Sequence, residues 1–176
     1  MSSQWPVLER VVEYETGWYQ GGFDLVEQPD GTTKRYYWAS LPPAVVIVAT
    51  IEDQLVFVEQ YRPTIRQHHL ELPAGIVEPD EDYCEAAKRE LREETGYEAG
   101  SLEFIQEVQA ATGILDHQRG YVFASELTEG EPLQDSNEFL TTRHIQVDDA
   151  VQLVRAPPTN DSSLMGILLA KADGHL

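Results

Sequence analysis

The chain has 176 residues, enough to bury one good hydrophobic core, and a formal net charge of −19 from 31 acidic against 12 basic side chains. So large an acid excess argues against a protein that binds along a nucleic-acid backbone or on an anionic membrane, since both need basic patches. Acid excess with scarce lysine is also typical of proteins adapted to concentrated salt, and we hold that as a hypothesis beside the simpler one of an acidic cytosolic protein.

The N-terminal segment has the pattern of a small antiparallel unit. Residues 11–19 and 21–27 are β-prone, and residues 29–31, Pro-Asp-Gly, form a turn signal. Residues 34–39 are rich in aromatic side chains and read as the returning strand. We therefore expect an N-terminal β extension over residues 1–41.

The rest of the chain, residues 42–176, alternates strand and helix patterns. Residues 44–50 form a continuous apolar run, as in a strand buried on both faces, and residues 55–61 return with alternation. Later expected elements are strands at 102–108, 120–125 and 139–147, a polar loop at 128–137, and helices at 148–155 and 161–171. Strands flanked by a few helices predict α/β or α+β layers.

A helix between these strands is well signalled. Asp82 followed by Glu85 fits a capping box, and Gly96 suits a left-handed C-terminal cap. Along this helix Glu90, Glu93 and Glu94 fall on neighbouring positions, where like charges cost a few tenths of a kcal/mol per pair. A divalent cation with oxygen ligands would remove that repulsion, whereas a solvated acidic helix face is the plain alternative.

The spacing of residues around this helix resembles the Nudix box of the Nudix hydrolases, which cleave nucleoside diphosphates linked to another moiety. The matching positions are Gly75, Glu81, Arg89, Glu90, Leu91, Glu93, Glu94 and Gly96, while Tyr97 stands where an aliphatic residue is more usual. The resemblance implies a Nudix α/β/α sandwich with a mixed sheet over residues 42–176.

The same resemblance implies roles for particular residues. The metal ligands would be Glu90, Glu93, Glu94, the backbone carbonyl of Ala74, and Glu138. Arg89 would orient the glutamates by ion pairing, and Glu81 would support the loop before the helix. Mg²⁺, or alternatively Mn²⁺, suits such hard oxygen ligands and would activate water against a pyrophosphate.

Two flanking stretches, residues 58–63 and 71–75, resemble the ADP-ribose pyrophosphatase branch of this family. By that resemblance Arg62 would contact a substrate phosphate, with a structural arginine as the alternative. The branch also implies a homodimer whose N-terminal strands cross between subunits.

Two departures from the branch leave the general base open. Residues 111–113, Ala-Thr-Gly, lack the proline of the branch's Ser-Pro-Gly, and Asp116-His117 replace a glutamate that is usual there. The candidate bases are Asp135, Glu138, Glu93 and His117. A base must reach the attacking water, and spacing does not give that distance.

The expected function is metal-dependent hydrolysis of ADP-ribose to AMP and ribose 5-phosphate. The alternatives are GDP-mannose or oxidised-nucleotide hydrolysis, or a nucleotide-binding sensor without catalysis. Cys84 is the single cysteine, which fits a cytoplasmic location. His68 and His69 are adjacent in an extended segment and so point opposite ways, and we expect ordinary loop histidines rather than a joint metal site.

Overall fold

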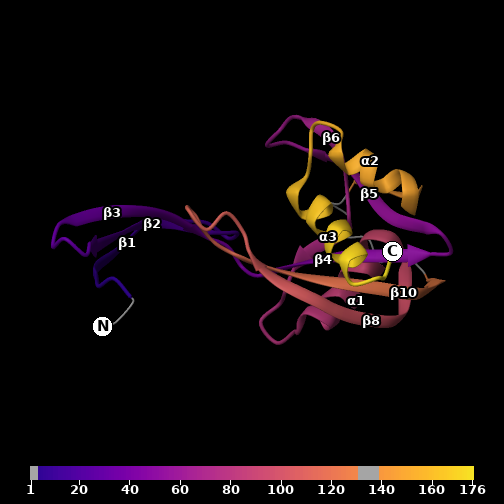
Figure 1. The fold of residues 1–176 in the computed structure, drawn as a ribbon, viewed down its shortest axis with the longest axis horizontal. Helices are drawn as coiled ribbons and strands as arrows, with labels where there is room; N and C mark the ends of the chain where they lie inside the picture. The colour runs from indigo at the N-terminus through magenta and orange to yellow at the C-terminus, as the bar shows by residue number, and fades with distance from the viewer. Residues whose placement is uncertain (1–3, 131–138) are drawn as a thin grey trace. The chain divides into compact units, whose positions relative to one another are not determined.

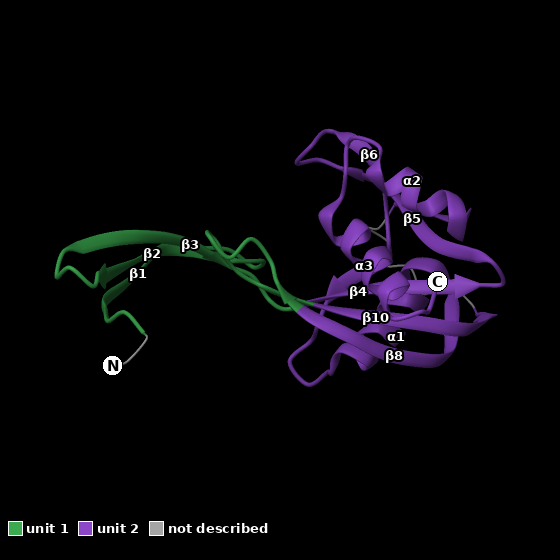
Figure 2. Ribbon diagram, in the orientation of Figure 1, with its two compact units in different colours: residues 1–43, 108–119 green, residues 44–107, 120–176 purple. Residues whose placement is uncertain are grey.

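The computed structural model describes residues 4–130 and 139–176, which form two compact units (Figures 1 and 2). Unit 1 comprises residues 1–43 and 108–119, and unit 2 comprises residues 44–107 and 120–176. Unit 1 thus adds residues 108–119 to the N-terminal segment, a contribution from the middle of the chain that the proposed boundary after residue 41 does not contain.

Unit 1 is built on an antiparallel sheet of β1 (Val7–Glu15), β2 (Gln20–Glu27) and β3 (Thr33–Ser40). Gly31 takes a φ of 80° in the turn between β2 and β3, a conformation that glycine adopts without steric cost. The first strand begins earlier than expected and ends at Glu15, because Thr16 hydrogen-bonds Tyr19 in a tight turn. A short strand, β9 (Leu115–Asp116), joins β3 in parallel.

The second sheet has the order β11-β5-β4-β10-β8, with β6 paired to β5 and β7 paired to β4. Its strands are β4 (Ala44–Ile51), β5 (Gln54–Arg62), β6 (Gln67–Glu71), β7 (Ala74–Ile76), β8 (Tyr97–Gln109), β10 (Gln118–Glu129) and β11 (Leu140–Gln146). Most expected strands are present, and the structure has β6 and β7 in addition to them.

Helices cover β4 from both sides. On one face Val45 and Ile47 pack in a cluster with Ala87 and Leu91 of α1 (Tyr83–Thr95). On the other, Gly166 of α3 (Asp161–Ala172) lies against Val48, so that a β-carbon there would be 3.2 Å from the valine. Helix α2 (Val147–Arg155) contacts α3 (Figure 1). This arrangement, in an α+β chain with mixed sheets, confirms the predicted sandwich and the strand buried on both faces.

The two adjacent histidines lie in β6 rather than in a loop, so that part of the expectation is wrong. His69 is buried and His68 is exposed, because successive strand residues point to opposite faces. In the portions of the chain that the structure describes, no helix combines the length and apolar character needed to cross a bilayer.

Candidate active site

The helix that carries the glutamates is held at both ends by local hydrogen bonds. Asp82 Oδ1 accepts from the backbone N–H of Glu85 at 2.9 Å, and Glu85 returns a carboxylate oxygen to the N–H of Asp82 at 2.9 Å. At the other end Gly96 adopts a φ of 78° and donates to the carbonyl of Arg92 at 3.0 Å. The predicted capping box and glycine cap are confirmed, and they fix the turn on which the acidic residues sit.

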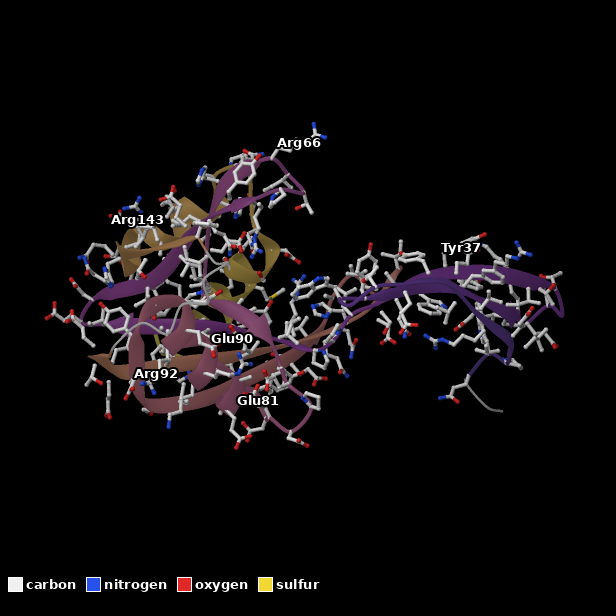
Figure 3. All side chains as sticks on the ribbon, turned by 180° about the vertical axis from the view of Figure 1, so that it is seen from behind. Tyr37, Arg66, Glu81, Glu90, Arg92 and Arg143 are labelled. Carbon is white, nitrogen blue, oxygen red and sulfur yellow. The ribbon has the colours of Figure 1, made fainter. Side chains whose placement is uncertain are left out.

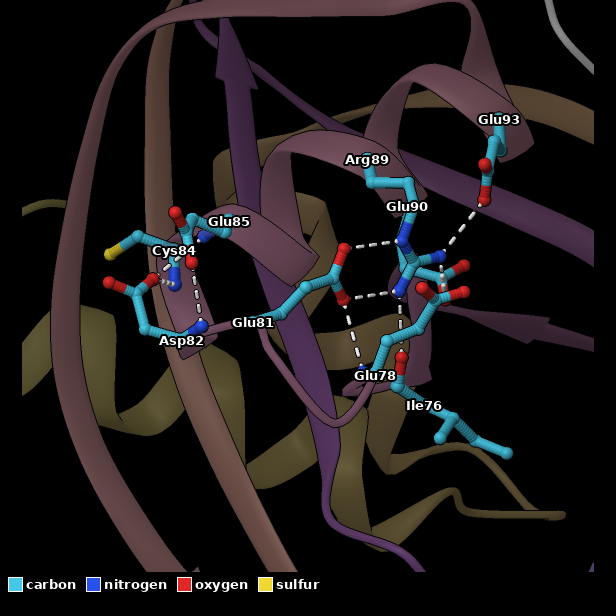
Figure 4. A network of polar contacts seen from close by, with 9 residues as sticks. All are labelled: Ile76, Glu78, Glu81, Asp82, Cys84, Glu85, Arg89, Glu90 and Glu93. Carbon is cyan, nitrogen blue, oxygen red and sulfur yellow. Dashed lines mark hydrogen bonds and ion pairs between the residues drawn. The ribbon is translucent and has the colours of Figure 1, made fainter.

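Arg89 is the centre of a polar network on this helix (Figure 4). Its Nε and Nη2 each donate to one oxygen of Glu81 at 2.8 Å. Its Nη1 donates to Glu90 at 2.7 Å and to Glu93 at 3.0 Å, and Nη2 also reaches the carbonyl of Ile76 at 2.8 Å. One guanidinium thus links three glutamates to the strand segment before the helix.

Electrostatics within the network follow from these contacts. The hydrogen bonds to Glu81, and then those to Glu90 and Glu93, raise the pKa of Arg89 above its usual value, so it stays cationic. The Arg89 contacts in turn hold the pKa of the Glu81 carboxyl below its ordinary value. Glu81 is therefore ionised at neutral pH, and a second bond from the Glu78 N–H at 3.1 Å fixes it in the loop.

Glu90 lies directly over Gly75 of β7. A β-carbon built on Gly75 would stand 1.9 Å from Cδ of Glu90, a separation that no real pair of atoms tolerates. A larger residue at this position would require the Glu90 carboxylate to move. The glycine and the glutamate are distant in sequence, so their spacing in the motif records a tertiary contact.

Glu94 is buried, at 6% exposure, and its carboxylate accepts a hydrogen bond from the Ala74 N–H at 3.0 Å. Ala74 is paired in β7 with Val46 of the central strand. The contact places the Ala74 backbone and the Glu94 side chain side by side, and these are two of the groups that the sequence resemblance assigns to a metal.

Arg62, at the end of β5, is bound to a residue that sequence reasoning missed. Its Nε donates to Glu71 Oε1 at 2.9 Å, and its Nη2 pairs with Oε2 of the same carboxylate. That pairing, together with the charge of Glu94, raises the pKa of Arg62. One signal could have revealed the pair: Glu71 stands between two leucines, and a carboxylate in such a run requires a cationic partner.

The carboxylates fit a hard divalent cation in chemistry and charge. A single Arg89 faces three glutamates, so negative charge remains, and the Glu90 carboxylate occupies the place where a β-carbon of residue 75 would stand. Within residues 4–130 and 139–176, however, no three His, Cys, Asp or Glu side chains already converge as a metal site. Glu90 and Glu93 are instead both hydrogen-bonded to Arg89 (Figure 4).

The four candidate bases differ in where they lie and in whether the structure describes them. Glu138 and Asp135 lie outside the described residues, and Glu93 is on α1 beside Arg89. His117 belongs to unit 1, where its Nδ1 bonds the Pro42 carbonyl at 2.9 Å and its Nε2 accepts from Arg119 at 3.3 Å. A carbonyl oxygen only accepts, so Nδ1 of His117 carries the ring hydrogen. The one lone pair of the ring is then on Nε2, which already accepts the hydrogen bond from Arg119.

Tyr97, the unusual residue after the helix, has a local explanation. It is buried in the core cluster, and its hydroxyl lies 2.9 Å from Nε2 of His144 on β11. An aliphatic side chain would fill the same core position without this link. Burial raises the pKa of the Tyr97 hydroxyl, so it remains protonated.

Comparisons with known proteins bear on the family and the fold. A family model described as NUDIX domain matches residues 40–165. Over 142 residues, 79% of this chain and 77% of the relative, the chain is 34% identical to a methanol dehydrogenase activator from Bacillus methanolicus. Over 140 residues, 78% of this chain and 76% of the relative, it is 32% identical to an ADP-ribose pyrophosphatase from Bacillus subtilis (strain 168). A crystal structure of an ADP compounds hydrolase shares the fold with a TM-score of 0.87 and 22% identity, covering 99% of this chain and 98% of that one.

Proposed function

The chain belongs to the Nudix hydrolase family, and we propose that it hydrolyses the pyrophosphate bond of nucleoside diphosphate sugars, with ADP-ribose as the preferred substrate and Mg²⁺ as the metal. The products would be AMP and ribose 5-phosphate. The observation that carries the proposal is the crowding of Glu81, Glu90 and Glu93 around one arginine, with Glu94 alongside. Such a surplus of carboxylate oxygen suits a cation that in turn holds a diphosphate.

The proposed metal ligands are Glu90, Glu93, Glu94 and the carbonyl of Ala74, with Glu138 as a further ligand or the base. A bound divalent ion supplies charge neutralisation of the diphosphate and a more acidic water at this site. Manganese would fit the same oxygen set.

The protein's own side chains would orient the groups that react. Arg89 restrains Glu90 and Glu93 through Nη1 and anchors itself on Glu81, so the carboxylates are held on one helix turn. Arg62 would bind a phosphate of the substrate, because a guanidinium matches phosphate oxygens. Electrostatic coupling between Arg62 and Glu94 supports a position for Arg62 near the carboxylates.

The decisive assay is a panel of nucleoside diphosphate sugars and oxidised nucleotides, with products separated by chromatography, in Mg²⁺, in Mn²⁺ and in chelator. We expect AMP and ribose 5-phosphate from ADP-ribose, only with metal. Preferential turnover of GDP-mannose or of an oxidised nucleotide would show that this compound, and not ADP-ribose, is the preferred substrate. Binding of ADP-ribose without turnover would favour a nucleotide sensor.

Unit 1 supports a proposal about assembly. Several of its apolar side chains are exposed, among them Trp18 at 73%, Tyr37 at 55% and Val12 at 48%. Exposed apolar side chains on both faces of this sheet support a part for unit 1 in an interface. We expect a homodimer formed through the N-terminal strands, located in the cytoplasm, with no nucleic-acid or membrane partner.

The acidic surface supports a salt-adapted protein, since screening relieves the repulsion among −19 net charges. A salt titration of thermal stability tests this, and full stability in dilute buffer without ligand would contradict it.

The similarity to a methanol dehydrogenase activator favours one second candidate, the activation of a dehydrogenase by this chain. Adding the protein to a methanol dehydrogenase and measuring its rate, with and without substitution of Glu93, would separate activation from hydrolysis.

A further inference from the structure

Among the described residues, the guanidinium of Arg62 donates hydrogen bonds from one edge only. Its Nε and Nη2 hold the two oxygens of Glu71, as described above, while Nη1 donates to no described group. A guanidinium is planar and presents its donors in a fixed fork. Fixing the Nε edge therefore fixes the direction of the Nη1 hydrogens as well. The arginine side chain is 43% exposed, so that second edge can be reached by a ligand.

Glu71 is buried where an isolated carboxylate would be costly. Its side chain is 7% exposed, and Leu72 beside it is buried as well. Its Oε1, which accepts from Nε of Arg62, also lies 3.2 Å from Nδ1 of His69, whose side chain is 7% exposed as well. The carboxylate is thus enclosed and cannot turn toward solvent when a ligand approaches.

His69 connects this pair to the segment between α2 and α3. Its Nε2 lies 2.9 Å from the carbonyl of Pro158, and because a carbonyl only accepts, Nε2 carries the hydrogen. Nδ1 then has no hydrogen-bond partner among the described residues, so His69 packs beside Glu71 at 3.2 Å without a hydrogen bond to it.

A second ion pair, between Arg143 of β11 and Glu59 of β5, is an ordinary surface pair. Arg143 donates through Nε at 2.9 Å and Nη2 at 2.7 Å, but both bonds go to one oxygen of Glu59. The two side chains are 53% and 35% exposed, against 7% for Glu71. The Arg62–Glu71 pair is two-pronged and buried on its acidic side, which is the geometry that confers orientation rather than mere proximity.

We propose that Glu71 is a positioning residue that orients the Arg62 guanidinium so that its Nη1 edge receives a phosphate of the nucleotide substrate. His69 lies beside Glu71 and helps to enclose it. The inference rests on the proposed function for its substrate class, a nucleoside diphosphate, but Glu71 itself touches neither substrate nor reacting atoms.

The test compares Glu71→Gln with the matched control Glu59→Gln. The first substitution keeps the size of the side chain, but the new amide NH₂ would face the arginine donors, so the orientation would be lost. We expect binding of α,β-methylene ADP-ribose, measured by calorimetry, and kcat/KM for ADP-ribose each to weaken about tenfold in Glu71→Gln and to stay unchanged in Glu59→Gln.

Two further measurements separate positioning from simple stabilisation. If Glu71 acts through Arg62, Glu71→Gln adds no loss to an Arg62→Ala variant. Added guanidinium ion, at a non-denaturing concentration, should partly restore the activity of Arg62→Ala but not that of the double variant, because Glu71 binds the added ion. Equal losses from the two glutamine variants, additive losses, or rescue without Glu71 would overturn the inference. If the wild-type protein binds the analogue but never hydrolyses ADP-ribose, the proposed function is wrong. The binding measurements on the variants would still decide the role of Glu71.

Discussion

The two units differ in where they keep their apolar side chains. In unit 2 the central strands are fully enclosed, with Val45, Ile47 and Val56 at 0% exposure beneath α1. In unit 1 the described aromatic residues lie largely at the surface, and Phe23 and Val26 are among its few buried apolar residues. A core of its own lets unit 2 hold charged groups in fixed positions, whereas unit 1 presents a surface that a partner could cover. Figure 3 shows Glu81 and Glu90 in unit 2 and Tyr37 in unit 1.

The sharpest test of the role of unit 2 is the removal of single negative charges. Glu93→Gln and Glu94→Gln should each reduce the rate of ADP-ribose hydrolysis by about three orders of magnitude. The fold should persist, because glutamine at position 94 can still accept the Ala74 hydrogen bond. Steady-state kinetics with circular dichroism measure both. Glu103→Gln, an exposed strand position, serves as control. Near-normal turnover in both variants would refute the site.

The next largest loss of rate is expected when a larger residue replaces Gly75 beside Glu90. Gly75→Ala would place a methyl group 1.9 Å from the Glu90 carboxyl carbon, so the carboxylate must move. Displacement of a catalytic group by about an ångström can cost up to about a hundredfold in rate, and we expect a loss of that order in kcat. Gly17→Ala in unit 1 is the matched control, because its added carbon meets nothing within 4 Å. An active Gly75→Ala variant would show that Glu90 need not stay in place.

Substitutions in unit 1 should weaken the dimer rather than change the rate of hydrolysis. Residues paired across strands share a face, so Tyr37 lies on the face of Phe23, and Val12 on the opposite face with Gly22. We expect Tyr37→Glu or Val12→Glu to raise the dimer dissociation constant about tenfold or more, whichever lies in the interface. Sedimentation at several concentrations measures this. A dimer unchanged by both substitutions would exclude both faces.

The smallest effect concerns acid stability. Because Arg89 lowers the pKa of Glu81 below its ordinary 4.5, this carboxylate stabilises the fold fully above that value and loses its contribution as the pH falls through the lowered one. Glu81→Gln should cost about 2 kcal/mol of unfolding free energy at pH 7, with the difference from wild type shrinking in strong acid. Urea unfolding at several pH values measures it, with Glu103→Gln as reference. A difference that stays constant down to the most acidic pH would show that Glu81 acts through packing alone.

Several site features were predictable because they are local. The capping box of Asp82 and Glu85 and the Gly96 cap depend on residues within one turn. The Arg89–Glu93 ion pair has the helical i,i+4 spacing, and it forms at 3.0 Å. Neighbours on a helix are set by the rise and twist of the backbone, so spacing alone is sufficient for such contacts.

Other features depend on strands that meet only in the folded protein. The pairing of Arg62 with Glu71 requires the antiparallel register of β5 and β6, in which Val58 faces Glu71 and Arg62 faces Gln67. The expected histidine loop is instead β6, whose formation is decided by pairing with β5 rather than by its own residues. Likewise, the inclusion of residues 108–119 in unit 1 involves β9, a two-residue strand too short to leave a pattern.

By itself, the amino-acid sequence determined the helix, its caps, its acidic face and the family, since these depend on short-range spacing. The tertiary structure decided which carboxylate each arginine binds and that Gly75 lies against Glu90, because those contacts join elements separated along the chain. Side chains that are distant in sequence become neighbours only when burial of the central strands brings their elements together, and the charges then pair within that fixed frame.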